Sequence, residues 1–452
     1  MDYLEGVRLV KEVEEKYDVM SVKFQGVSIW PMLRTYMFMA DTDDQKPFTA
    51  SKSTVMAVLK GVFYYSWAPL FKRHKLWVGT SSRERKIVKG KFINRTLGAV
   101  CHIDDNALIW ESSTPFVPNV PKKDIEERNI ISGNINLLIR YALKYLLFWW
   151  KPKLEHEDVL QQICKEYNYA FDYMSYVRRL YSEKKTTDFL LALLPKPQKM
   201  LLICSYGQFG NVWSLKNHGV KVIELQHGVL NSLHYGYNPK YYSKELYPDV
   251  MCVMGEVEYK YFTEENTSFC KNIEKVGLYM LDYAKEAFGD DLFAKYRSRY
   301  KAIIVIAGQM PIEDKIQLFF DELAMKKPDY LFVYIPREPN IEQLMKEPNT
   351  LFCPGVNIYE YLKWCDLHCT VSSTTCLESQ FFSKGTLFWD YDGVATEYYG
   401  KVLKSENGVE YVKTVDEAEQ AIDSLLNGNF KYRDIFYQGN VKRLRSILEK
   451  YK

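Results

Sequence analysis

The sequence lacks the short motifs with which several enzyme classes bind phosphate or metal. It has neither a G-x-x-x-x-G-K-[S/T] loop nor a G-x-G-x-x-G run, which argues against a kinase and a nicotinamide-dependent dehydrogenase. Its His and Cys residues do not occur at the spacing of a metal site. The sequence therefore indicates no bound metal and no resident cofactor.

The sequence also lacks a large net charge and closely spaced pairs of cysteines. The formal net charge of the 452 residues is only +3, so no strong field predicts a nucleic-acid partner. The nine cysteines are odd in number, form no C-x-x-C pair and lie mostly in apolar runs. This usage is typical of reduced, buried thiols and predicts a cytoplasmic location instead of a disulfide framework.

Long hydrophobic runs are missing as well. The most apolar stretch, Ile135–Trp150, carries Arg140 and Lys144 and is shorter than the roughly 20 residues of a membrane-spanning helix. Because these two basic residues are four apart, they share one face of a helix. Such a helix either lies flat against the inner face of the cytoplasmic membrane or packs on the domain with a basic edge outward.

What the sequence does contain is an alternation of short apolar runs and longer helical stretches, which predicts an α/β fold. A chain of this length favours two cores, so we expect two Rossmann-like, doubly wound domains that face each other across a cleft. A break near Gly277–Asp291 separates them. The predicted strands are Lys75–Thr80, Ala107–Trp110, Lys199–Cys204, Val220–Leu225, Asp249–Met254, Ala302–Ala307, Tyr330–Ile335, Thr350–Phe352, Leu367–Thr370 and Gly385–Trp389.

Open α/β sheets bind ligands at the carboxyl ends of their strands. The run Val220–Gly228 brings Glu224, Gln226 and His227 to such an end, with Gly228 at the turn. A histidine here can act as general base or orient a hydroxyl group. His234 and Tyr237 crowd the same loop, which favours this interpretation over a histidine held by backbone groups at a tight turn.

Four consecutive hydroxyl residues close a strand of the second series and open a helix. Ser372, Ser373, Thr374 and Thr375 can offer hydroxyl and free N–H groups to a phosphate, and Glu378 lies one turn later, where a carboxylate can bind ribose. The alternative is plain helix capping, with Glu378 completing a capping box.

Two weaker signals follow other strands of the second series. Arg337 can bind phosphate bidentately, unless it pairs with the neighbouring Glu338 on the surface. Gly308 lets the backbone approach a ligand, and Gln309 can contact a donor or an acceptor.

The run Thr80–Arg85 in the first series resembles an anion-binding loop, through Ser82, Arg83 and Arg85. Glu84 is the only acidic residue between Phe71 and Arg95, a stretch rich in lysine and arginine. This patch is either a solvated basic face or a surface for lipid phosphate or an acidic acceptor.

The motifs after Val220 and after Cys369 resemble those of GT-B-fold, nucleotide-sugar-dependent glycosyltransferases from bacterial capsule and lipopolysaccharide gene clusters. The Gln-His-Gly loop is similar to their N-domain pattern, and Ser372–Thr375 with Glu378 resembles the motif of sialyl-, Kdo- and polyol-phosphate transferases. Many of those families have a His-Pro pair where this chain has Arg337-Glu338-Pro339.

The resemblance implies an organisation and a set of roles. Residues 1–285 would form an acceptor-binding domain with a membrane-facing insert, residues 286–432 a nucleotide-sugar-binding domain, and residues 433–452 a helix that crosses back. The implied partners are a CMP- or UDP-sugar donor and a glycan or lipid-linked glycan acceptor. The expected catalytic residues are His227, Glu224 and Gln226, with His227 the one that the resemblance assigns to the acceptor side. The expected acceptor-binding residues are Gly228, His234, Tyr237, Ser82, Arg83 and Arg85. The implied donor-side residues are Gly308, Gln309, Arg337, Glu338, Ser372, Ser373, Thr374, Thr375 and Glu378.

Three other functions remain open at this point. A CDP-polyol phosphotransferase of the teichoic-acid type shares the architecture but attacks phosphorus. A non-hydrolysing nucleotide-sugar epimerase would place several carboxylates in the cleft. A non-catalytic glycan-binding protein would need neither the histidine loop nor the hydroxyl cluster.

Overall fold

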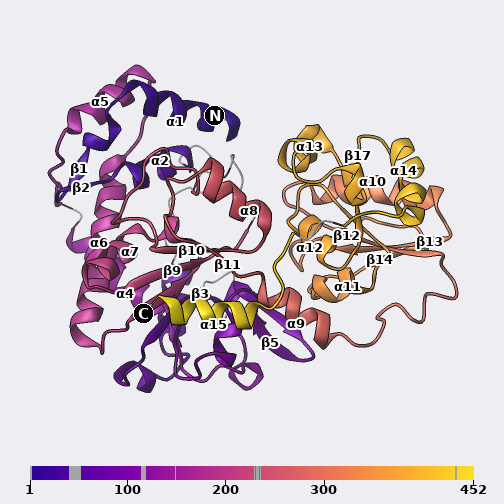
Figure 1. Cartoon of the computed structure of the whole chain (residues 1–452), viewed down its shortest axis with the longest axis horizontal. Helices are drawn as coiled ribbons and strands as arrows, with labels where there is room; N and C mark the ends of the chain where they lie inside the picture. Colours follow the sequence, from indigo (N-terminus) through magenta and orange to yellow (C-terminus); the bar gives the residue numbers. More distant parts are fainter. Residues whose placement is uncertain are drawn as a thin grey trace.

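The computed structural model describes residues 3–39, 52–113, 119–147, 149–228, 230, 234, 236–432 and 435–451. They form two α/β domains, each built around one wholly parallel sheet (Figure 1). The described helices are α1 (Tyr3–Lys16), α2 (Trp30–Met39), α3 (Lys52–Val62), α4 (Asn134–Leu146), α5 (Glu157–Glu166), α6 (Tyr173–Leu193), α7 (Phe209–Asn217), α8 (Glu256–Lys260), α9 (Tyr279–Ala287), α10 (Glu313–Lys326), α11 (Ile358–Trp364), α12 (Thr375–Phe381), α13 (Val394–Tyr399), α14 (Val415–Asn427) and α15 (Asn440–Lys450).

The sheet of the first domain has the strand order β11-β10-β9-β8-β3-β6-β7. Its strands are β3 (Leu76–Ser81), β6 (Leu108–Ser112), β7 (Ile130–Ser132), β8 (Lys199–Leu202), β9 (Lys221–Leu225), β10 (Val250–Val253) and β11 (Ile273–Lys275). The chain winds outward in opposite directions from the neighbouring strands β3 and β8. This reversal is the topological switch point, where doubly wound sheets leave a crevice for ligands.

The sheet of the second domain has the order β14-β13-β12-β15-β16-β17 and reverses between β12 and β15. Its strands are β12 (Ala302–Ala307), β13 (Tyr330–Ile335), β14 (Thr350–Phe352), β15 (Leu367–Thr370), β16 (Gly385–Trp389) and β17 (Val409–Val412). Strand β12 is apolar throughout and buried at every position, as expected of a central strand with helices on both faces. The two doubly wound domains predicted from the sequence are confirmed.

Two small antiparallel pairs were not predicted. One is β1 (Lys23–Phe24) with β2 (Val27–Ser28), and the other is a hairpin of β4 (Arg85–Val88) and β5 (Lys91–Asn94). The hairpin follows β3 and reaches the second domain, because the Asn357 side chain donates to the Ile87 carbonyl at 3.0 Å. It therefore places its residues between the two domains.

The end of the chain returns to the first domain. Figure 1 shows α15, in yellow, lying beside α9 below the first sheet. The backbone amide of Asn440 donates to Asp282 at 2.7 Å, and Arg445 donates to the His102 carbonyl at 2.9 Å. The segment between Lys275 and Ala302, which includes α9, connects the last strand of one sheet to the first strand of the other.

Helix α4 contains most of the stretch for which a membrane-surface position was one interpretation. Ile135 and Ile139 pack on the domain core, and Arg140 donates to the buried carboxylate of Glu183 at 2.5 Å. Arg140 is thus turned toward α6, which favours the alternative that this helix packs on the domain. Within the described residues, no helix combines the length and the apolar character that crossing a membrane requires.

Candidate functional site

The loop after β9 carries a chain of polar groups that ends at His227. Tyr237 donates to the buried carboxylate of Glu224 at 2.5 Å, and its hydroxyl oxygen lies 3.2 Å from Nδ1 of His227. Burial lowers the pKa of His227 and raises that of Glu224. A neutral His227 with one nitrogen held by Tyr237 can accept a proton at its other nitrogen.

Two neighbours of His227 are placed differently from what the sequence suggested. Both ends of the buried Gln226 amide serve the fold, because Gln226 accepts from the Met254 amide at 2.7 Å and donates to the Gly228 carbonyl at 2.7 Å. Tyr237 is fully buried, so it can act only through His227 and cannot contact an acceptor. The expected catalytic role of Gln226 and acceptor contact of Tyr237 are therefore corrected.

His234 packs its ring against Tyr237, with 4.7 Å between ring centres. Burial, together with the neighbouring His227, lowers the pKa of His234 to about 3. The His234 ring is therefore neutral, and it packs on Tyr237, the residue that holds His227. Gly228 has no atom within 4 Å of the position of an added Cβ, which leaves open space beside the loop.

The switch point of the second sheet brings Gln309 and Ser372 together. Gln309 follows β12 and Ser372 follows β15, and the two residues exchange a pair of hydrogen bonds, of 2.5 Å from the Gln309 amide to the Ser372 hydroxyl and 2.9 Å from the Ser372 amide to the Gln309 oxygen. The sequence separated these residues by 63 positions. Their pairing leaves Ser373 and Thr374 as the half-buried hydroxyls of this edge.

Thr375 faces away from that edge. Its hydroxyl lies 3.0 Å from Nε2 of His368, a histidine of β15 whose pKa burial lowers to about 3. The predicted donor contact of Thr375 is corrected, because its side chain points into the core. Thr374 makes no side-chain capping bond to α12, so the capping-box alternative is also absent.

Gly308 and Arg337 are linked by a residue that the sequence analysis missed. The carboxylate of the buried Glu313 accepts from the Arg337 backbone amide at 2.6 Å and from the Tyr334 hydroxyl. An added Cβ at Gly308 would lie 2.4 Å from the Glu313 carboxylate, so only glycine fits there. The Arg337 and Glu338 side chains are exposed, and in the described part of the chain neither forms the ion pair that was the alternative.

The hairpin supplies two further cations that the sequence analysis did not select. Arg95, which follows β5, donates to Glu378 of α12 at 2.6 Å, and Tyr359 also donates to that carboxylate at 3.2 Å. Burial opposes the charge of Arg95, but Tyr359 and Glu378 raise its pKa above the usual range. The buried Glu378 thus has Arg95 as its partner where a ribose was predicted.

Lys86 lies beside the same groups. Burial lowers its pKa, the charge of Arg95 lowers it further, and Arg337 adds to this repulsion, while Glu84 and Glu378 act in the opposite sense. No ion pair of Lys86 occurs among the described residues. Arg95 and Glu84 also influence the pKa of His227. Residues from both domains therefore surround one interdomain region.

The remaining predicted acceptor residues lie just before this hairpin or at its first position. Arg85 is fully buried, where its Nε donates to Glu111 at 2.6 Å and its Nη1 donates to Glu127 at 3.0 Å. Ser82 is buried too, and only Arg83 is exposed. The acceptor contacts expected of Arg85 and Ser82 are corrected, because Arg85 joins the hairpin to β6 and the loop before β7.

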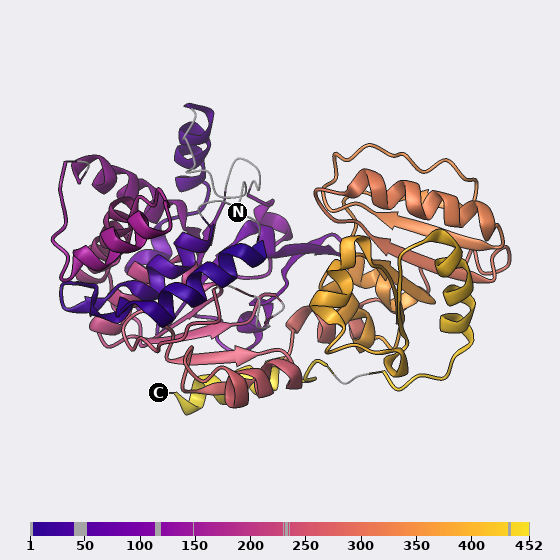
Figure 2. The ribbon, with the colours of Figure 1, turned by 90° about the horizontal axis from the view of Figure 1, so that it is seen from above.

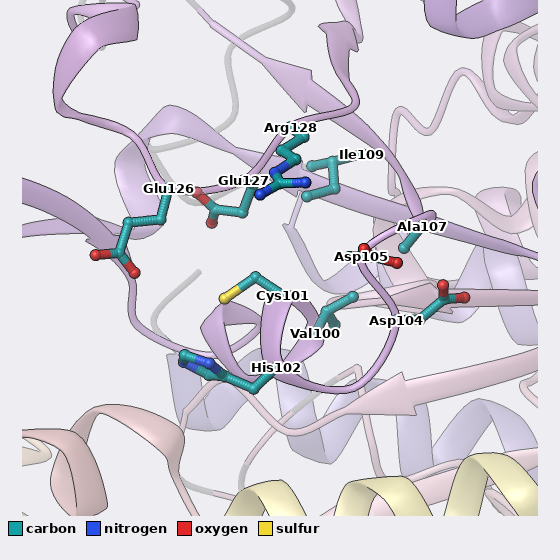
Figure 3. A pocket seen from close by; sticks show the side chains of 10 residues that line it. All are labelled: Val100, Cys101, His102, Asp104, Asp105, Ala107, Ile109, Glu126, Glu127 and Arg128. Carbon is teal, nitrogen blue, oxygen red and sulfur yellow. The ribbon is translucent and has the colours of Figure 1, made fainter.

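A cavity of about 210 Å³ lies elsewhere, among residues that precede β6 and β7 (Figure 3). Four carboxylates line it, those of Asp104, Asp105, Glu126 and Glu127. Such a lining repels phosphate. The interdomain region differs, since it holds the cations Lys86, Arg95 and Arg337 besides the carboxylates of Glu84 and Glu378.

No protein-family model and no curated protein matches this sequence. Solved structures do. S. aureus MnaA in a co-structure with UDP matches with a TM-score of 0.51 and 12% identity, covering 84% of this chain and 96% of that one. CalG4, the calicheamicin glycosyltransferase, matches with a TM-score of 0.51 and 12% identity, covering 84% of this chain and 98% of that one. UDP-GlcNAc 2-epimerase of Methanocaldococcus jannaschii matches with a TM-score of 0.50 and 11% identity, covering 83% of this chain and 99% of that one. Together with the two parallel sheets, these likenesses show that the chain has the GT-B fold.

Proposed function

We propose that the protein is a glycosyltransferase that moves a sugar from a nucleotide donor to a cell-surface glycan, of the capsule or lipopolysaccharide kind. The observation that carries the proposal is the Arg95–Glu378 pair between the two domains, at 2.6 Å, whose Arg95 charge acts both on Lys86 and on His227, while Arg337 of the second domain also acts on Lys86. Lys86 is half-buried and forms no ion pair among the described residues. A cation partly withdrawn from water favours an anionic ligand, and the phosphate of a nucleotide supplies that charge.

The site residues have separate roles in this reaction. The Nε2 of His227 accepts the proton of the acceptor hydroxyl, whose oxygen forms the new bond to the anomeric carbon. The bond from that carbon to the donor phosphate breaks, and its electron pair stays on the phosphate oxygen. Lys86, Arg95 and Arg337 stabilise this negative charge in place of a metal ion. Ser373 and Thr374 hydrogen-bond the phosphate from the other side of the switch point.

The test is nucleotide binding by the whole protein. CMP, CDP, UDP, GDP and dTDP are added singly, with magnesium or with EDTA, and the melting temperature is measured. A nucleotide at a hundred times its dissociation constant stabilises the fold by about 2.7 kcal/mol. We expect one nucleotide to raise the melting temperature equally in both buffers. If no nucleotide raises the melting temperature, the donor site is refuted. If a nucleotide raises it only in the buffer with magnesium, metal independence is refuted.

The fold likeness to UDP-GlcNAc 2-epimerase favours one second candidate, a nucleotide-sugar epimerase. Epimerisation removes and returns a proton at a sugar carbon, which needs acidic or basic groups on both faces of the ring. Incubation with UDP-GlcNAc alone in D₂O, followed by NMR, separates the two functions. Deuterium at C2 together with a second UDP-sugar would replace the transferase by the epimerase. No deuterium is expected of the transferase.

A further inference from the structure

Helix α3 carries an apolar face that no described part of the chain covers. Val55, Met56 and Leu59 lie on one side of the helix at spacings of three and four residues, and Phe63 continues that side just past the helix end. The exposed fractions of Met56 and Phe63 are 54% and 73%. The opposite side, with Val58 and Val62, is buried against the domain.

The apolar face extends into the next turn. The ring of Phe63 stacks on that of Trp67, with centres 5.6 Å apart and planes 9° from parallel. The Trp67 indole donates to the Val62 carbonyl at 3.0 Å, which closes the turn and fixes both rings at the surface. The backbone thus keeps two large aromatic side chains exposed to solvent. Contact of this apolar surface with water is unfavourable, and a bound partner would remove it from water.

Lysine side chains border this face. Lys60 is exposed on α3, and the Lys122 ammonium lies 4.9 Å from the ring centre of Tyr64, next to the exposed Lys123. From residue 45 to residue 83 the sequence contains no Asp or Glu. An apolar face bordered by lysines matches the chemistry of an anionic lipid surface, with acyl chains for the rings and phosphate for the lysines.

The face also lies at the functional edge of the first sheet. Asn134, which follows β7, donates to the hydroxyl of Ser113, which follows β6, at 3.1 Å. Gly61 of α3 packs closely on Asn134, because an added Cβ at Gly61 would lie 2.3 Å from the Asn134 side chain. Helix α3 is therefore fixed at the carboxyl ends of β6 and β7, the same sheet edge that carries the loop of His227. Figure 2 shows α3 standing out from the first domain at the top of the view.

We propose that α3 and the stacked pair Phe63–Trp67 dock the protein on a membrane that contains anionic lipids. This surface differs from the stretch around Arg140 that the sequence suggested. Docking turns the edge with His227 toward the bilayer, so an acceptor attached to a lipid can reach the site; this consequence rests on the proposed function. The docking itself does not depend on nucleotide binding.

Co-sedimentation with vesicles tests the proposal. The full chain is mixed with phosphatidylcholine vesicles and with vesicles of phosphatidylcholine and phosphatidylglycerol. We expect binding to the anionic vesicles, and a loss of roughly tenfold or more in the double variant L59Q/F63Q, since two exposed apolar side chains no longer enter the lipid. The matched control is L318Q/M325Q on α10, which replaces side chains that are 58% and 59% exposed in the second domain.

The electrostatic part has its own variant. Lys60→Glu should weaken binding to anionic vesicles by about fivefold or more, because each basic residue near such a surface contributes about 1 kcal/mol. Wild-type protein that does not sediment with anionic vesicles, or an L59Q/F63Q variant that sediments as well as wild type, overturns the proposal. If the wild type does not bind vesicles but forms a dimer in solution, and the L59Q/F63Q variant is monomeric, the face would be assigned to contact with a second copy of the chain. Nucleotide-induced stabilisation should be unchanged in all these variants.

Discussion

The Arg95 guanidinium of the first domain donates to the Glu378 carboxylate of the second at 2.6 Å, across 283 positions of sequence. Both side chains are largely buried, with exposed fractions of 18% and 3%. Tyr359 shares the carboxylate, and Lys86 and His227 lie within the influence of the Arg95 charge. This ion pair therefore joins the two domains beside the candidate site.

Arg95→Ala should destabilise the protein, because it leaves the Glu378 carboxylate buried without its cation. Removing one partner of a buried pair costs about 3 kcal/mol, and the partial exposure of Arg95 lowers this to roughly 2 kcal/mol. Urea unfolding measures the change. The matched control is Arg297→Ala, which removes ion pairs with Asp291 and Asp366 whose side chains are about one-third exposed. Equal losses in both variants would contradict a special role of the interdomain pair.

Lys86→Ala should weaken nucleotide binding by roughly tenfold or more, since a charge-assisted hydrogen bond to phosphate contributes about 1.5–3 kcal/mol. Isothermal titration with the nucleotide that stabilises the wild type measures this. Lys89→Ala, at the exposed turn of the same hairpin, serves as the control and should bind normally. Unchanged affinity in Lys86→Ala would show that phosphate binds elsewhere.

His227→Ala should abolish turnover while nucleotide affinity changes little. Burial and the charge of Arg95 lower the pKa of His227 below its ordinary value of 6.5, outweighing the opposite effect of Glu84. The proton-accepting neutral form therefore persists below pH 6.5, and kcat should fall only at more acidic pH. A profile of kcat against pH in the wild type checks the sign of the shift. An acid limb above pH 6.5, or a variant that turns over normally, would remove His227 from the mechanism.

Gly308→Ala should destabilise the second domain by about 1–3 kcal/mol, as in other overpacked sites. The new methyl group would lie 2.4 Å from the Glu313 carboxylate and 2.7 Å from the Tyr334 hydroxyl, so the link to Arg337 must shift. Nucleotide affinity should fall with it. Gly289→Ala is the control, because no atom lies within 4 Å of its added Cβ and its backbone is not left-handed. Thermal unfolding distinguishes the two.

Local pattern was enough to predict the sheets. All ten predicted strands are present, since runs such as Ala302–Ala307 are short, apolar throughout and rich in β-branched residues, as buried parallel strands are. The strand-like run Ile273–Gly277 at the break contains β11, whereas the short strands β7 and β17 escaped detection. Ile130–Ser132 has three residues, and Val409–Val412 contains a glutamate, so neither has the apolar length that the pattern requires.

The sequence by itself also determined which loops lie at the ligand-binding edges of the sheets, because parallel strands end at one edge and the loops with His227, Gln309 and Ser372 follow such ends. Only the tertiary structure decided which side chains face that edge. Thr375 and Arg85 turn into the core, while Lys86 and Arg95 come from a hairpin whose basic residues the sequence showed but whose direction it did not. The reason is physical: side-chain direction and charge pairing depend on tertiary contacts, from the Arg85–Glu111 pair 26 positions apart to the Arg95–Glu378 pair 283 positions apart, and these contacts exist only after the chain has packed.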